Sequence, residues 1–133
     1  MDSMKMHRTL TLPEEGSANP QEIMRLLAQI PNDIAYHTTQ KIAAEEDVMM
    51  GAVVLRRMRD NLLCEYLTTS KTKAQAELRV RLNEDVLEVE DQQLKHERRL
   101  KRINQILTAL ETLFVGARKI ASIMQVEMQN LPR

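Results

Sequence analysis

The chain has 133 residues, which suits one domain, and its 19 Lys and Arg balance its 19 Asp and Glu, which excludes a general electrostatic attraction to nucleic acid. The single cysteine, Cys64, excludes an internal disulfide bond and a thiolate metal site, and it fits a reducing cytosol. Aromatic residues make up 2% of the chain and glycine occurs three times, so residues that favour sheets and hairpin turns are scarce while good helix formers abound, and we expect an all-α protein.

The N-terminal region is predicted to contain a flexible tail followed by a short helix. Residues 1–18 show no sustained hydrophobic period, so we expect them to form the tail. Asn19 can cap a helix in which Pro20 suits the first turn. Pro31 is expected to stop this helix, because an interior proline lacks the amide hydrogen that a helix needs. Residues 19–133 together are predicted to form a single helical domain.

Two long helices, arranged as a hairpin, are predicted after this point, because no proline occurs between Asn32 and Leu131. The first is expected at about residues 33–67, where apolar residues recur three or four positions apart and Gly51 weakens the helix locally. Two threonines then break the pattern, and Ser70 can cap a second segment that begins near Lys71.

Residues 78–82 leave two interpretations open. Leu78-Arg-Val-Arg-Leu82 alternates like a strand, although the apolar residues around it keep a helical period. Asn83 is expected to mark a kink. From about residue 86 to residue 130 the pattern predicts one continuous helix.

This last helix carries an unbroken heptad seam with steps of three and four residues. Ile106, Leu113 and Ile120 add a second apolar row, and a helix apolar over so much of its circumference needs more than one partner. We therefore predict a helical homo-oligomer, with a monomeric three-helix bundle as the alternative. The expected oligomer interface consists of Leu100, Ile103, Leu107, Leu110, Phe114, Ala117, Ala121 and Met124.

Residue types that carry catalysis or bind metals do not cluster. The three histidines stand far apart without a His or Cys neighbour at ligand spacing, and His37 is expected to be a surface or partly packed residue and not a metal ligand. Cys64 follows two leucines and is expected to be a small buried hydrophobic residue. No glycine-rich phosphate loop is present. We expect no enzymatic activity, no cofactor and no metal.

The sequence also predicts a cytoplasmic protein without a membrane partner. No apolar run reaches transmembrane length, and the N-terminus lacks the apolar core of a signal peptide. Carboxylates gather at residues 45–47 and again at residues 84–91, where they predict solvated faces or surfaces for a partner.

Basic residues form three local groups on this neutral chain. Any one of them can be a charged outer face, but three together predict a phosphate-binding surface. Because aromatic residues for base stacking are nearly absent, we expect contacts to the nucleic-acid backbone. The groups are Arg56, Arg57 and Arg59; then Lys71, Lys73, Arg79 and Arg81; and finally Lys95, Arg98, Arg99 and Arg102, on one side of the last helix.

Four segments in the same order resemble the UvsY family of phage recombination mediator proteins, over about residues 33–128. Residues that resemble the family's first long helix are Asp33-Ile34, Thr39, Lys41-Ile42, Ala43-Ala44, Val48-Met49 and Leu55. The later segments are Glu77-Leu78-Arg79-Val80-Arg81-Leu82, then Asp85-Val86-Leu87-Glu88-Val89-Glu90, and finally Leu100 to Glu127. Asn83-Glu84-Asp85 stands where the family has tyrosines, and the loop before Asp85 is shorter than in the family.

The resemblance implies a ring-forming accessory protein of recombination, acting in the host cytoplasm if it is phage-encoded. Such a protein binds single-stranded DNA through phosphates, reorganises a single-strand-binding protein and helps load a recombinase. In the family, the basic pair that matches Arg79 and Arg81 is associated with binding of single-stranded DNA. We expect Lys71 and Lys73 to assist, with the group from Lys95 to Arg102 in reserve.

The expected contact depends on the conformation of residues 78–83. In a helix, Arg79 and Arg81 would point about 200° apart, whereas in an extended segment residues two apart point to the same side. The DNA-contact hypothesis therefore prefers a break in the helix there. The alternative function is that of a helical oligomeric interaction protein, such as a chaperone, scaffold or adaptor, without nucleic-acid binding.

Overall fold

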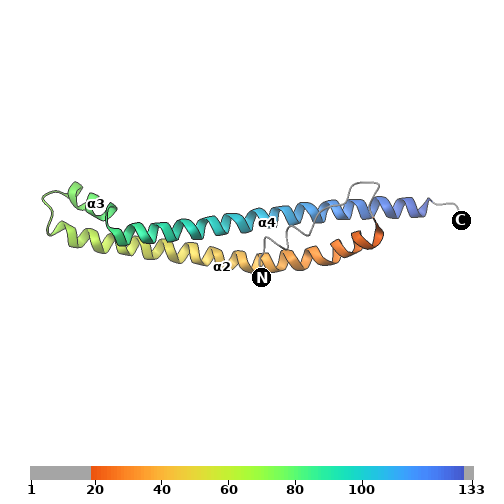
Figure 1. The fold of residues 1–133 in the computed structure, drawn as a ribbon, viewed down its shortest axis with the longest axis horizontal. Coiled ribbons are helices and arrows are strands. Elements are labelled where there is room, and N and C mark those ends of the chain that lie inside the picture. The colour runs from red at the N-terminus through yellow and green to blue at the C-terminus, as the bar shows by residue number, and fades with distance from the viewer. Residues whose placement is uncertain (1–18, 131–133) are drawn as a thin grey trace. The chain divides into compact units, whose positions relative to one another are not determined.

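The computed structural model describes residues 19–130, and it is helical throughout apart from short connections (Figure 1). Its elements are α2 (Pro20–Leu67), α3 (Lys73–Arg81) and α4 (Glu84–Gln129), with no strand among these residues. The predicted all-α class is thus confirmed. The predicted tail, residues 1–18, lies outside the described part of the chain. No helix within residues 19–130 combines the length and the apolar character needed to cross a membrane.

The predicted short N-terminal helix is wrong as a separate element, because α2 continues through Pro31. Its beginning lies where the sequence predicted it: the amide nitrogen of Gln21 donates to Asn19 Oδ1 at 2.9 Å. Pro31 removes one amide hydrogen, but Ile30 is fully buried and Ile34 packs against the same apolar cluster. Packing of this face sustains the helix, since tertiary contacts contribute more to helix stability than local propensity does.

Contacts between residues divide the molecule into two compact units, each containing parts of α2 and α4. The described part of unit 1 consists of residues 19–40 and 103–130, and it has an apolar core. Both helices contribute to this core: Ile23, Leu26 and Ile30 come from α2, and Ile106, Leu110 and Ala117 come from α4. Partly buried residues that pack against it are Leu27, Ile34, Leu113, Phe114, Ile120, Ala121 and Met124.

Unit 2, Lys41–Arg102, is held together by small apolar residues and polar bridges. Its buried hydrophobic residues are Ala44, Ala76, Val80 and Val86. The buried side chain of Gln93, on α4, donates from Nε2 to the Val48 carbonyl oxygen of α2 at 2.8 Å. Two ion pairs also join these helices, one between Arg59 and Glu90 and one between Arg99 and Asp47.

At Gly51, the side chain of Gln93 on α4 approaches the backbone of α2 closely. A Cβ atom at this position would lie 1.9 Å from Gln93 Oε1. The glycine predicted to weaken the helix therefore also makes room for the amide that binds Val48, since a residue without a side chain permits close approach.

Two caps define the connection between the long helices. Asn83, where the sequence predicted a kink, lies between α3 and α4 and caps α4: its Oδ1 accepts hydrogen bonds from the Asp85 and Val86 amides at 2.9 and 3.2 Å. The predicted cap at Ser70 is wrong, because Thr72 caps α3 and accepts from the Gln75 amide at 3.2 Å. The strand-like interpretation of residues 78–82 is wrong as well, since α3 extends to Arg81.

Candidate nucleic-acid interface

Arg79, the first residue expected to contact DNA, is engaged in the connection between α2 and α3. Its guanidinium lies 4.1 Å from the centre of the Tyr66 ring, within the range of a cation–π interaction. The same guanidinium donates to Thr69 Oγ1 at 2.7 Å and to Ser70 Oγ at 3.1 Å. Asn83 Nδ2 donates to the Tyr66 hydroxyl at 2.8 Å, so the cap of α4 meets the same ring. Arg79 therefore stabilises the turn.

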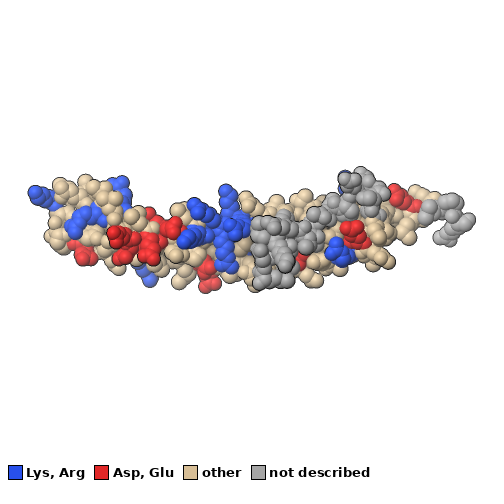
Figure 2. Space-filling model, in the orientation of Figure 1, with Lys and Arg blue, Asp and Glu red and all other residues tan. Residues whose placement is uncertain are grey.

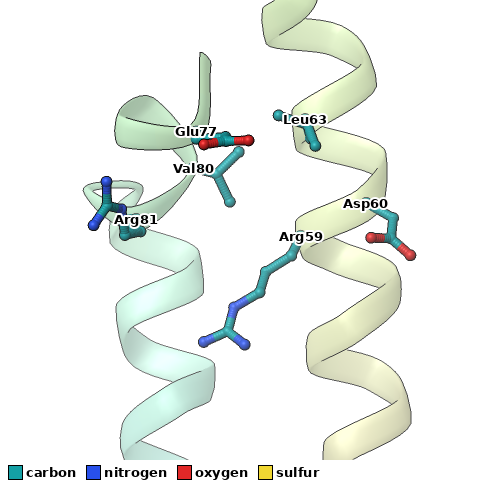
Figure 3. A pocket seen from close by; sticks show the side chains of 6 residues that line it. All are labelled: Arg59, Asp60, Leu63, Glu77, Val80 and Arg81. Carbon is teal, nitrogen blue, oxygen red and sulfur yellow. The ribbon is translucent and has the colours of Figure 1, made fainter. Parts of the chain in front are cut away.

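Arg81 points in another direction from Arg79, because both belong to α3 and residues two apart in a helix are separated by about 200°. Arg81 lines an open pocket of about 230 Å³ between α2 and α3 (Figure 3). In that view its guanidinium points away from α2, and Arg59 extends between the helices. The other residues that line the pocket are Asp60, Leu63, Glu77 and Val80.

This pocket mixes signs of charge and does not form a basic cradle. Asp60 and Glu77 contribute carboxylates, and Arg59 pairs with Glu90. Lys73, expected to assist in binding, lies 4.0 Å from Glu77 in an exposed ion pair. Within one chain the structure thus does not bring Arg79 and Arg81 to one face, and carboxylates stand among the cations around them.

The third basic group has a different geometry. Lys95, Arg98 and Arg102 are exposed on α4, and their spacing confines them to about 60° of the helix circumference. We call these three residues the basic stripe. Arg99 departs from it: its Nη1 lies 3.3 Å from Asp47 Oδ2, so this side chain turns toward α2. Lys95 pairs with Asp91 at 3.3 Å along the helix.

Carboxylates precede the basic stripe on the same side of α4. Glu84, Glu88 and Asp91 are exposed, and we call them the acidic block. On the face seen in Figure 2, Asp and Glu gather toward the beginning of α4 and Lys and Arg gather beyond them. The inner side of this part of α4 is occupied by Val86 and Gln93, which are buried. The outer side is thus available to partners.

From Ile103 onward, the heptad seam expected to join copies of the chain lies in unit 1, where its predicted interface residues are buried or half-buried. Ile103, Leu107, Leu110 and Ala117 are buried, and the cluster that contains Leu110 and Ala117 includes residues of α2. The other predicted interface residues, Leu100, Phe114, Ala121 and Met124, are half-buried. Because α2 is one continuous helix from Pro20, its first turns pack against the seam residues of α4 within the same chain. The sequence predicted only a short separate helix before Pro31. Pairing between copies along this seam stays a prediction.

Two expectations for single residues are wrong. Cys64 is exposed and not buried, because it follows the half-buried Leu63 and therefore points about 100° away from it. His37 is buried, with its ring edge-on to Tyr36 at a centroid distance of 5.1 Å. Asp33, one turn before His37, is also buried, and burial raises the pKa of its carboxyl while the charge of His37 partly opposes this shift. Residues 19–130 contain no group of His, Cys, Asp and Glu that could hold a metal ion.

The sequence offered no signal for Tyr66 as a functional residue of the turn, because its partners lie on other elements.

No family model, no curated protein and no solved structure matches the chain.

Proposed function

We propose that the chain is a non-enzymatic accessory protein of DNA recombination that binds single-stranded DNA and helps load a recombinase onto it. The basic stripe of α4 carries this proposal. Its three cations extend over about 10 Å along the helix axis on an exposed side, where flexible side chains can meet successive phosphates. Neither Arg98 nor Arg102 forms an ion pair with another residue in the range 19–130.

This proposal assigns the main DNA contact to the basic stripe, which the sequence indicated only as the reserve candidate after Arg79 and Arg81. Arg79 would have to leave the Tyr66 ring and two hydroxyl groups before it could bind a phosphate. Lys95 would exchange one exposed ion pair with Asp91, and exposed pairs contribute little to stability. Phosphate contacts without stacking predict affinity that falls steeply with salt and depends little on base sequence.

The recombination context comes from the resemblance of residues 33–128 to the UvsY family. It implies a single-strand-binding protein and a recombinase as partners. A protein of this kind performs no covalent chemistry, since its task is to exchange one protein for another on the DNA strand.

A second candidate, an interaction protein without DNA binding, is favoured by an apolar hollow in unit 2. Ile42 and Met49 on α2 are each more than half exposed, and they line this hollow together with Leu100 of α4. Glu45 and Glu46 also line it. Exposed apolar side chains surrounded by charge are typical of a surface that receives another protein.

Titration of a labelled oligothymidine, followed by fluorescence anisotropy at several salt concentrations, tests the proposal. Arg98→Ala with Arg102→Ala should weaken binding at low salt and reduce the salt slope by about 1.4, since each phosphate contact on a single strand contributes about 0.7. Arg56→Ala with Arg57→Ala is the matched control, because it removes two exposed arginines from the same unit. Equal losses in both variants would indicate general charge and not the stripe. Absence of binding by the unmodified protein at low salt would favour the interaction protein.

A further inference from the structure

The outer side of α4 in unit 2 is divided into two blocks of opposite charge. The acidic block comes first and the basic stripe follows, and all six side chains are exposed. At 100° per residue they fall within about 80° of the helix circumference, so they form one continuous face. Figure 2 shows carboxylates and cations side by side along this part of the molecule. The two blocks are therefore available to the same partner.

The spacing of these charges is symmetric about residue 93. Glu84 and Arg102 each stand nine positions from it. Glu88 and Arg98 each stand five positions away, and Asp91 and Lys95 each stand two positions away. A second α4 laid antiparallel and centred on this residue would place unlike charges at the same level along the axis in every pair. A parallel copy in register would place like charges together, which is unfavourable.

Two leucines lie along one edge of this face and supply apolar area. Leu87 is 48% exposed and Leu94 is 47% exposed, one heptad apart. Because Leu94 is next to the centre of the charge pattern, an antiparallel arrangement brings the Leu94 side chains of the two copies together. Burial of apolar surface then adds affinity to the specificity and orientation that complementary charges give.

We infer that a second copy of this chain docks antiparallel on the outer face of α4, with the acidic block of each copy against the basic stripe of the other. This interface is separate from the heptad seam, which from Ile103 onward belongs to unit 1. Charge complementarity favours a second copy of this chain over an unrelated helix. Read in the reverse direction, the face presents the opposite charge at each of its six charged positions.

The docked copy has a consequence that rests on the proposed function. The carboxylates of one copy occupy the place that phosphates would take on the cations of the other. Single-stranded DNA and the second copy therefore compete for the basic stripe, and oligonucleotide should release the docked copy.

Charge exchange tests the docking itself. The acid-to-base variant carries Glu84→Lys, Glu88→Lys and Asp91→Lys, and the base-to-acid variant carries Lys95→Glu, Arg98→Glu and Arg102→Glu. In sedimentation velocity, the unmodified chain should associate at micromolar concentration and dissociate as salt rises. Each variant alone should associate at least about tenfold more weakly, and an equimolar mixture should recover a complex. A mixture that stays monomeric, or an unmodified chain that is monomeric at low salt, overturns the inference.

Single charge reversals provide a matched control on the same helix. Glu88→Lys should weaken association, whereas Glu97→Lys should not, because Glu97 is exposed about 140° from the centre of the face. Equal effects of these two variants would overturn the assignment of the face.

Cross-linking gives a measurement that does not depend on altered charges. Leu94→Cys in a Cys64→Ser background should form an intermolecular disulfide readily under mild oxidation. Leu87→Cys in the same background should not, since antiparallel copies place the two residues 87 about 18 Å apart along the axis. Efficient cross-linking at both positions indicates parallel packing and contradicts the inference. Oligonucleotide that binds without releasing the complex contradicts the competition and leaves the docking intact, whereas a docked chain that binds no oligonucleotide rejects the proposed function alone.

Discussion

The two units use the same pair of long helices but hold them together by different means. Unit 1 buries large aliphatic side chains such as Leu26, Ile30 and Leu110. The buried hydrophobic residues of unit 2 are two alanines and two valines. Unit 2 also contains 13 of the 19 basic and 12 of the 19 acidic residues of the chain. One helix pair thus combines an apolar core with a charged region whose outer side chains are available to partners.

The difference shows how stability and register can be assigned to separate parts of a hairpin. Burial of apolar surface stabilises unit 1 but is non-directional, so it tolerates small shifts between helices. The bond from Gln93 to the Val48 carbonyl requires one specific alignment, and the pair of Arg99 with Asp47 adds to it. Unit 2 thereby fixes which residues face each other while most of its charged side chains stay exposed.

The largest expected effect concerns the source of stability. Leu110→Ala removes a side chain that is 1% exposed and should lower the free energy of unfolding by about 2–5 kcal/mol. Leu78→Ala is the matched change in unit 2, away from the proposed docking face, and should cost far less, since Leu78 is 48% exposed. Urea denaturation followed by circular dichroism measures both. Similar losses would show that the units are stabilised in the same way.

The next effect tests register in unit 2. Gly51→Ala places a Cβ where Gln93 Oε1 lies, so the Gln93 amide must move and give up its bond to Val48. We expect a net loss of up to about 2 kcal/mol, because a buried hydrogen bond is lost while alanine raises helix propensity. In a Gln93→Ala background the same substitution should instead stabilise by about 0.5–1 kcal/mol. A double-mutant cycle of Gly51→Ala and Gln93→Ala, measured by urea denaturation, tests this coupling. Additive effects of the two substitutions would exclude a contact between residues 51 and 93.

A smaller effect is expected at the turn. Tyr66→Phe removes the hydroxyl that accepts from Asn83 and should cost about 0.5–1.5 kcal/mol. Asn83→Ala also removes the cap of α4 and should cost about 1 kcal/mol more. Thermal unfolding monitored by circular dichroism compares the two. If they cost the same, the cap contributes nothing measurable.

The smallest expected effect is the pH dependence that Asp33 gives to unit 1. Burial raises the pKa of this carboxyl in the folded chain, so the folded state binds its proton more tightly than the unfolded state does. Its contribution to stability is therefore greatest below the ordinary aspartate pKa and is lost as pH rises through the raised pKa. Asp33→Asn should remove this decline and increase stability at neutral pH. Urea denaturation of the unmodified protein and of Asp33→Asn across the mildly acidic range measures this effect. The same pH profile of stability in both proteins would contradict the prediction.

Local signals predicted local features well. Asn19 caps α2 as expected, because a cap depends on a side chain and amides two or three residues away. Asn83, which was expected to mark a kink, lies at the break between α3 and α4. The exposed spacing of Lys95, Arg98 and Arg102 also follows from helix geometry alone. The all-α class followed from composition for the same reason, since helix propensity is a property of each residue.

Features that depend on distant partners could not be predicted. The continuation of α2 through Pro31 requires the apolar cluster of unit 1, whose α4 residues all lie beyond residue 105. Arg99 left the basic stripe because Asp47, 52 positions earlier, lies beside it. Arg79 is held by a ring and hydroxyl groups on the preceding segment, and no spacing rule connects these residues.

The bond between Asn83 and Tyr66 also bears on the order of folding. It joins residues 17 positions apart, so closing this loop costs little chain entropy, and the same asparagine then starts α4. The core of unit 1 brings Ile23 to residues such as Ala117, which requires a far longer loop to close. The turn therefore has the properties of a folding nucleus. Contacts between α2 and α4 would then form progressively, beginning with the residues nearest the turn. Substitution of Tyr66 should slow refolding, whereas substitution of Leu110 should mainly accelerate unfolding.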